Sequence, residues 1–126
     1  MSMIDPMARV RGLGSAKEGT HHWIAQRMTA VALIPLTLWF VISLIGLIGA
    51  DLAAVKDWLS SPFNAVMMIL TLIAGFHHAQ LGLQVVIEDY IHGEGCKIAA
   101  LWFVKGAAFF FGAAAVFSVV KLALGA

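Results

Sequence analysis

Residues 28–49 read MTAVALIPLTLWFVISLIGLIG and carry no charged side chain. A helix needs about 20 mainly apolar residues to cross about 30 Å of hydrocarbon, and this run is long enough. Two further apolar runs, 62–87 and 98–124, are also long enough. Transmembrane strands are shorter, about 9–11 residues, and alternate in polarity, which these runs do not. The sequence therefore predicts an all-α membrane protein with three transmembrane helices, at about 23–49, 62–90 and 98–124.

Composition agrees with this fold class. Of 126 residues, 61% are hydrophobic and 12% are charged, against roughly 45–50% and 25% in soluble domains. These values exclude a disordered chain, a nucleic-acid-binding domain and an ordinary cytosolic enzyme. The net charge of +1 implies no polyanionic partner. The single cysteine, Cys96, excludes an intramolecular disulfide and the zinc sites that need several cysteines.

The chain divides into a polar amino-terminal arm, residues 1–22, and a three-helix anchor domain, residues 23–126. Basic residues concentrate before and just inside the first helix: Arg9, Arg11, Lys17 and Arg27. The positive-inside rule then predicts an amino terminus inside and a carboxyl terminus outside. The first apolar run is longer than the core of a cleaved signal peptide. An amino-terminal Met without a long presequence favours a bacterial inner membrane over a mitochondrial one.

Local signals mark the helix ends. Thr20 is the expected cap of the first helix, and Ser60 or Ser61 that of the second, where Pro62 suits the first turn. Pro35 should kink the first helix.

The second helix carries the most polar residues, in FHHAQLGLQVVIEDY, residues 76–90. An imidazole at membrane depth can make a helix–helix hydrogen bond, relay protons or bind a metal. The small residues Gly75 and Gly82 share the face of His78. They leave a recess that suits either a planar macrocycle with an axial imidazole or close packing of another helix. His77 points about 100° away, so it and His78 cannot both be axial ligands of one iron. A haem on His78 would need its second axial histidine from a partner subunit.

The second helix ends in a carboxylate and a phenol. Asp89 lies 11 residues after His78 and returns to within about 20° of its face. The Tyr90 hydroxyl can donate a hydrogen bond to a quinone carbonyl, and Asp89 can orient it or deliver protons. Alternatively, Tyr90 belongs to the interfacial aromatic belt and Asp89 is a solvated helix end. Arg27 can pair with a haem propionate or snorkel to lipid headgroups.

Other polar residues allow weaker expectations. Lys105 fits snorkelling or a contact with a partner, and His92 is a candidate for proton uptake. The pattern assigns no role to Gln80 or Gln84. The chain has no flavin or nicotinamide fingerprint, no cysteine cluster for iron–sulfur and no framed catalytic triad. We therefore expect no oxidation of a soluble substrate by this chain alone.

Two motifs resemble a known family. Residues 78–90, HAQLGLQVVIEDY, resemble the H-x₁₀-D-Y signature of the succinate dehydrogenase hydrophobic membrane anchor subunit, the D-type subunit of respiratory complex II. Residues 19–30, GTHHWIAQRMTA, resemble that family's segment leading into its first helix.

The resemblance implies a four-subunit succinate:ubiquinone oxidoreductase of the tricarboxylic acid cycle and electron transport. Its partners would be a flavoprotein subunit, an iron–sulfur subunit, a C-type cytochrome b anchor subunit and membrane lipid. Haem b would be shared with the C-type subunit, and ubiquinone would be the substrate. By position in the motifs, His78 matches the axial haem ligand, Tyr90 the quinone ligand, Asp89 its neighbour and Arg27 the arginine near the propionates. His21 falls where some relatives carry a histidine.

Two alternatives stay open. The chain could be the anchor of a quinol:fumarate reductase, since sequence does not set the direction of the reaction. It could also be a structural membrane subunit without a cofactor. An ion channel is disfavoured, because the first and third helices offer too few polar groups to line a pore.

Overall fold

The computed structural model describes Met7 and residues 17–125 of the chain. Four helices make up nearly all of this part: α2 (Lys17–Gly46), α3 (Leu52–Ser60), α4 (Pro62–Tyr90) and α5 (Glu94–Ala123). Three of them are long and apolar enough to cross a membrane, over Gly19–Gly46, Pro62–Tyr90 and Glu94–Ala123. The described part contains no strand. The predicted all-α fold with three transmembrane helices is thus confirmed. Most of the predicted arm, including Arg9 and Arg11, lies outside the described residues.

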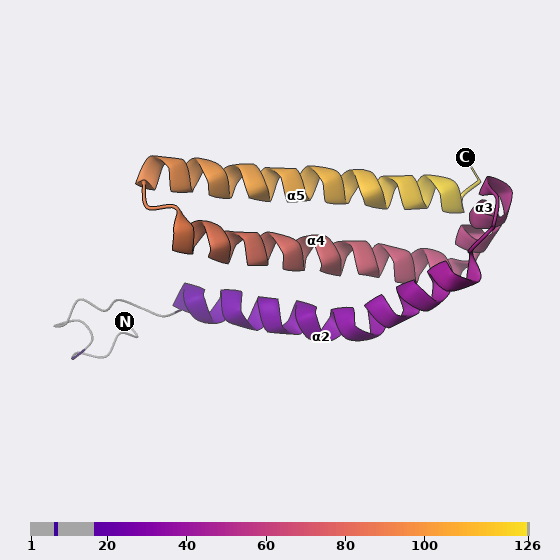
Figure 1. The fold of residues 1–126 in the computed structure, drawn as a ribbon, viewed down its shortest axis with the longest axis horizontal. Helices are drawn as coiled ribbons and strands as arrows, with labels where there is room; N and C mark the ends of the chain where they lie inside the picture. The colour runs from indigo at the N-terminus through magenta and orange to yellow at the C-terminus, as the bar shows by residue number, and fades with distance from the viewer. Residues whose placement is uncertain (1–6, 8–16, 126) are drawn as a thin grey trace.

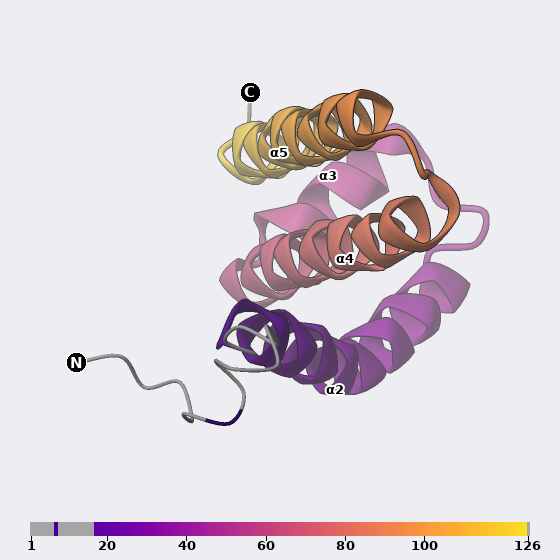
Figure 2. The same ribbon diagram turned by 90° about the vertical axis from the view of Figure 1, so that its left-hand side faces the viewer.

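The three long helices form one layer with α4 in the middle. Helix α4 packs against α2 on one side and α5 on the other, and within residues 17–125 α2 does not contact α5. Figures 1 and 2 show this order from two directions. The start of α2 and the turn from α4 to α5 lie at one end of the layer, while α3 and the end of α5 lie at the other (Figure 1). Helix α4 is therefore the only long helix with a neighbour on both sides, within that described part.

Helix boundaries differ from the sequence-based ones at three ends, one of which is the end of α2, at Gly46 rather than near residue 49. Helix α2 begins at Lys17 rather than near residue 23, so Thr20 lies inside the helix and is not its cap. Helix α5 begins at Glu94 rather than near residue 98, with Gly93 as its N-cap. The bounds of α4 agree with the prediction, with Pro62 in the first turn. Pro35 lies inside α2, and the axis of that helix bends in mid-course (Figure 1).

The segment between the first two spans, expected to be a loop, forms the short helix α3. The side chain of Asp51 accepts a hydrogen bond of 2.9 Å from the backbone N–H of Ala54 and so caps the helix. The Trp58 ring stacks on Trp39 of α2, with ring centroids 5.7 Å apart. Asn64 donates a 2.9 Å hydrogen bond to the Trp58 carbonyl. These contacts tie α3 to α2 and α4.

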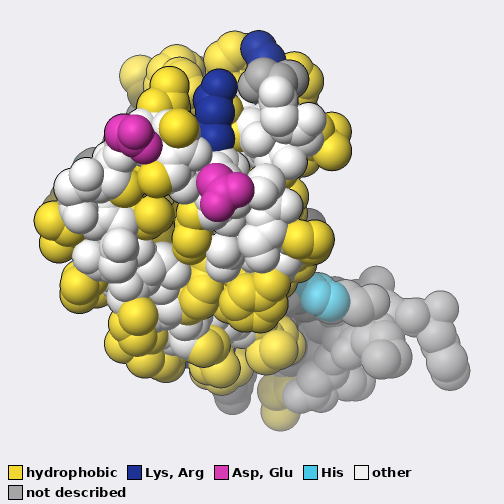
Figure 3. Space-filling model, turned by 90° about the vertical axis from the view of Figure 1, so that its right-hand side faces the viewer, with side chains coloured by type: hydrophobic (Ala, Val, Ile, Leu, Met, Phe, Trp, Pro, Cys, Tyr) yellow, Lys and Arg dark blue, Asp and Glu magenta, His cyan; other side chains and the backbone are white. Residues whose placement is uncertain are grey.

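Few side chains are buried within this layer. The buried hydrophobic residues of the described chain are Leu36, Leu59, Leu81, Ile87 and Val119. Large hydrophobic side chains are exposed along all three long helices. On the end of the molecule that carries α3, charged side chains stand among hydrophobic ones (Figure 3). In water the exposed hydrophobic surface of the long helices would be unfavourable. It fits contact with lipid tails and with the helices of other membrane subunits.

The orientation in the membrane stays a prediction, and the lone cysteine offers a test. Cys96 is exposed and lies near the start of α5, at the end expected to face inside. A membrane-impermeant maleimide should label Cys96 in inside-out vesicles but not in right-side-out ones. In a Cys96→Ser background, the Asp57→Cys variant should show the opposite pattern, because Asp57 lies in α3 at the other end. Labelling with the two patterns exchanged would reverse the assigned orientation.

Candidate functional site

The first contact of the candidate site joins α2 to the middle of α4. The hydroxyl of Thr29 lies 3.0 Å from Nδ1 of His78. The same hydroxyl lies 2.8 Å from the carbonyl oxygen of Ala25 and 3.0 Å from that of Gln26. His78 is half-buried, and its Nε2 has no hydrogen-bond partner among the described residues. One ring nitrogen therefore contacts α2, while the other has no partner among the described residues.

The face of α4 around His78 is open. A Cβ atom built at Gly75 or at Gly82 would meet nothing within 4 Å in the described structure. Gly112 of α5 differs, because a Cβ there would lie 3.5 Å from the Phe76 ring. Close helix packing inside this chain therefore uses Gly112, and not the glycines beside His78. The described residues leave the space beside Gly75 and Gly82 open, and a recess that receives a group there stays a prediction.

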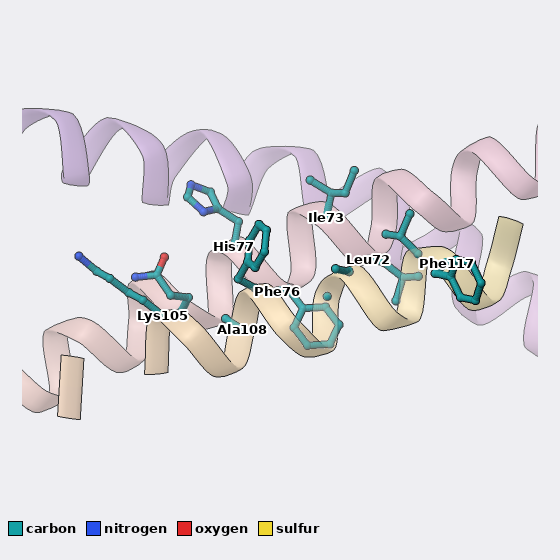
Figure 4. Close-up of a pocket in the computed structure, with 12 residues that line it drawn as sticks. Leu72, Ile73, Phe76, His77, Lys105, Ala108 and Phe117 are labelled. Carbon is teal, nitrogen blue, oxygen red and sulfur yellow. The ribbon is translucent and has the colours of Figure 1, made fainter. Parts of the chain in front are cut away.

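His77 belongs to a different place. It lines a groove of about 640 Å³ between α4 and α5. Figure 4 shows His77 and Lys105 at one end of this groove and Leu72 and Phe117 toward the other. The remaining lining is mostly apolar and aromatic. The two adjacent histidines thus lie on different surfaces of α4. Of the two, only His78 makes a hydrogen bond to α2.

The two glutamines of α4 form a ladder along the helix. Gln80 Nε2 donates to Gln84 Oε1 at 3.3 Å, and Gln84 Nε2 donates to Glu88 Oε1 at 2.9 Å. Each step spans four residues, which is the spacing of neighbours on a helix face. Each side chain of the ladder gives the next a hydrogen-bond partner at membrane depth. This pairing explains Gln80 and Gln84, to which the sequence assigned no role.

The structure keeps the other predicted site residues apart from His78. Asp89 and Tyr90 end α4 and are exposed, Tyr90 by 79%. Arg27 is also exposed, and its guanidinium carbon lies 5.4 Å from the centre of the Trp23 ring. None of the three makes a hydrogen bond or ion pair within residues 17–125. Because Arg27 and Thr29 are two residues apart, their side chains leave α2 about 160° apart. Within the described residues, these three side chains therefore do not form a binding site by themselves.

Sequence reasoning missed two residues that face α4. Thr29 was not singled out, although it lies inside the motif of residues 19–30. The neighbouring histidines His21 and His22 also differ in their surroundings. His21 is exposed, whereas Nε2 of His22 is buried without a hydrogen-bond partner. His22 precedes Thr29 by seven residues, which places it within about 20° of the same face of α2.

Comparison with known proteins decides the family. Residues 1–120 match the model of the succinate dehydrogenase/fumarate reductase transmembrane subunit. The chain belongs to this family. It is 38% identical to the succinate dehydrogenase hydrophobic membrane anchor subunit of Paracoccus denitrificans over 131 residues, covering 100% of this chain and 97% of the relative.

Other relatives carry similar names. The succinate dehydrogenase hydrophobic membrane anchor subunit of Rickettsia bellii is 38% identical over 68% of each chain. The succinate dehydrogenase membrane anchor subunit of Reclinomonas americana is 30% identical over 71% of this chain and 77% of its own. The chain is thus a succinate dehydrogenase membrane anchor subunit, a component of an enzyme complex, and the resemblance carried by its two motifs is confirmed.

Proposed function

We propose that this chain anchors a succinate:ubiquinone oxidoreductase in a bacterial inner membrane, shares haem b with a C-type anchor subunit, and contributes to the ubiquinone-reduction site. Its family and its three apolar helices support the anchoring role. The names of its relatives favour succinate dehydrogenase over a quinol:fumarate reductase. The flavoprotein and iron–sulfur subunits would supply the chemistry for which this chain has no residues.

The observation that carries the haem proposal is the state of His78. Its Nε2 has no partner among the described residues, and the recess at Gly75 and Gly82 is open beside it. Imidazole is a common axial ligand of haem iron. Within residues 17–125, no three metal-ligating side chains form a cluster. His78 would therefore hold the haem from this chain, and a histidine of the C-type subunit would hold it as well.

Two residues of this chain, His78 and Arg27, would bind different parts of that haem. Bound haem b takes up and releases single electrons. His78 would hold the iron through Nε2 and fix the position of the macrocycle between subunits. Arg27 would pair with a propionate by charge-assisted hydrogen bonds. For this its guanidinium would have to leave the Trp23 ring, a contact worth only about 0.5–1 kcal/mol at an exposed site.

The quinone is bound and reduced at the end of α4. The Tyr90 hydroxyl would donate a hydrogen bond to one quinone carbonyl, and the Asp89 carboxylate would orient the phenol and pass protons toward it. Quinone takes up two electrons, which come from the iron–sulfur subunit, and two protons, which come from the same side, to give quinol. Since Tyr90 is 79% exposed in this chain, the rest of the pocket would come from the neighbouring subunits.

A visible spectrum tests the haem proposal directly. The detergent-purified complex should show, in a reduced-minus-oxidised difference spectrum, the α-band of a b-type haem with two histidine ligands. Haem extracted from the complex should be about equimolar with this chain. A purified four-subunit complex without that band would overturn the ligand role of His78 and leave the quinone site as the proposal that survives.

A further inference from the structure

The contact between Thr29 and His78 raises a question of which atom carries the proton. A threonine hydroxyl has one hydrogen to donate, and its oxygen can also accept. Three possible partners surround Thr29 Oγ1: the carbonyl oxygens of Ala25 and Gln26, and Nδ1 of His78. The neutral imidazole carries its one hydrogen on either Nδ1 or Nε2. Two arrangements of these hydrogens are therefore possible.

The arrangements differ in the number of hydrogen bonds they make. If Thr29 donates to a carbonyl of its own helix, then Nδ1–H of His78 donates to the hydroxyl oxygen, and two hydrogen bonds form. If Thr29 donates to Nδ1 instead, only that bond forms, and Nε2–H is a donor with no partner among the described residues. An unsatisfied donor at membrane depth is unfavourable. Donation by threonine to the carbonyl four residues earlier is also a common geometry in helices. The first arrangement is favoured on both counts.

From this network we infer that Thr29 is a positioning residue that fixes the tautomer and the ring orientation of His78, so that the lone pair of Nε2 points to an iron ligand site. The inference rests on the proposed haem role of His78. Metal-binding histidines usually donate their other N–H to an acceptor that orients the ring and raises its basicity. Here the acceptor is the Thr29 hydroxyl, itself oriented by the backbone of α2.

Thr71 in α4 provides the comparison within the same chain. Its hydroxyl donates to the Met67 carbonyl at 2.7 Å, the same four-residue contact that Thr29 makes with Ala25. Thr71 has no side-chain partner within the described part of the chain. Both threonines are half-buried. Thr29 differs from Thr71 in its contact with Nδ1 of His78 and in a second carbonyl oxygen, that of Gln26, at 3.0 Å. Thr71→Val therefore controls for loss of the four-residue contact alone.

Three variants of the complete complex test the inference. Thr29→Val removes the hydroxyl and nearly preserves the volume, Thr29→Ser restores the hydroxyl, and Thr71→Val is the matched control. The readouts are the rate of haem loss to excess apomyoglobin and the midpoint potential of the haem. For Thr29→Val we expect haem loss roughly 10-fold faster or more, the usual effect of removing such an acceptor. We also expect a more positive potential, because a less basic imidazole stabilises ferric iron less.

The remaining outcomes are equally specific. Thr29→Ser and Thr71→Val should match the wild type in both readouts. Wild-type potential and haem retention in Thr29→Val would overturn the role of Thr29 while leaving His78 as a ligand. Equal changes in Thr29→Val and Thr71→Val would show a packing effect, and would also overturn it. A wild-type complex that holds no haem would overturn the haem proposal itself, and this inference with it.

Discussion

Replacing His78 with alanine is expected to abolish the b-type haem band of the purified complex, whereas His77→Ala leaves the band in place. Removing an axial imidazole takes away the bond from this chain to the iron. Losing a residue that only hydrogen-bonds to a metal ligand already lowers the affinity for the metal by about 10–100-fold, so loss of the ligand itself should lower it more. Haem content per complex, measured after extraction, should fall at least 10-fold in His78→Ala.

His77→Ala is a well-matched control because the two residues are chemically identical neighbours at the same membrane depth. His77 lines the groove between α4 and α5, on the far side of which lie α5 residues such as Lys105. His78 contacts α2 and borders the open recess. Loss of haem from His77→Ala with retention in His78→Ala would assign the ligand to the groove and contradict the proposal. Equal retention in both would remove this chain from the haem ligands.

The transmembrane architecture can be predicted almost completely from the sequence, for a simple physical reason. Crossing hydrocarbon requires about 20 apolar residues with all backbone groups paired, and few other folds require such runs. Three runs therefore predict three spans, and the structure has them. Helix α3 cannot be predicted in this way, because its nine residues are too few to span a membrane. Its signal is local: Asp51 stands three residues before the backbone N–H that it caps.

Likewise, only some residues of the candidate site can be predicted from the sequence. His78 and its glycine recess follow from helical spacing, since residues three, four and seven apart share a face. A Cβ at Gly75 or Gly82 would meet no described atom within 4 Å, and both the recess and the ligand role of His78 stay predictions. Thr29 could not be found in this way, because its partner is 49 residues away in sequence and on another helix. The same is true of His22, whose buried nitrogen depends on how α2 is turned toward α4.

The outcome for Arg27 shows a further limit of sequence reasoning. Its place one turn after Trp23 is visible in the sequence, and the structure places its guanidinium over that ring. Whether it turns to a propionate depends on subunits that pack on the exposed face of α2. The same holds for Asp89 and Tyr90, which are exposed at the end of α4. The motifs therefore point to these residues, but the described part of one chain does not give the geometry of their proposed sites.

The second large effect is expected at Tyr90. Tyr90→Phe keeps the aromatic ring and its burial against lipid, and removes only the hydroxyl. If that hydroxyl donates to the quinone carbonyl on which negative charge develops, its loss should cost the equivalent of one charge-assisted hydrogen bond, about 1.5–3 kcal/mol. The kcat/KM for ubiquinone reduction should then fall roughly 10- to 100-fold. Succinate oxidation with an artificial dye acceptor should stay close to the wild-type rate, because it does not use the quinone site.

Trp102→Phe separates this role from that of an interfacial anchor. Trp102 lies two turns into α5, near the same end of the layer as Tyr90, and is similarly exposed, 74% against 79%. Both variants replace a polar-tipped aromatic residue by phenylalanine, so a belt function would make them alike in both assays. A quinone ligand would make only Tyr90→Phe defective, and only with quinone. Equal loss of dye and quinone activity in Tyr90→Phe would instead mean that the phenol stabilises the assembled complex, and the quinone would have to be bound by other residues.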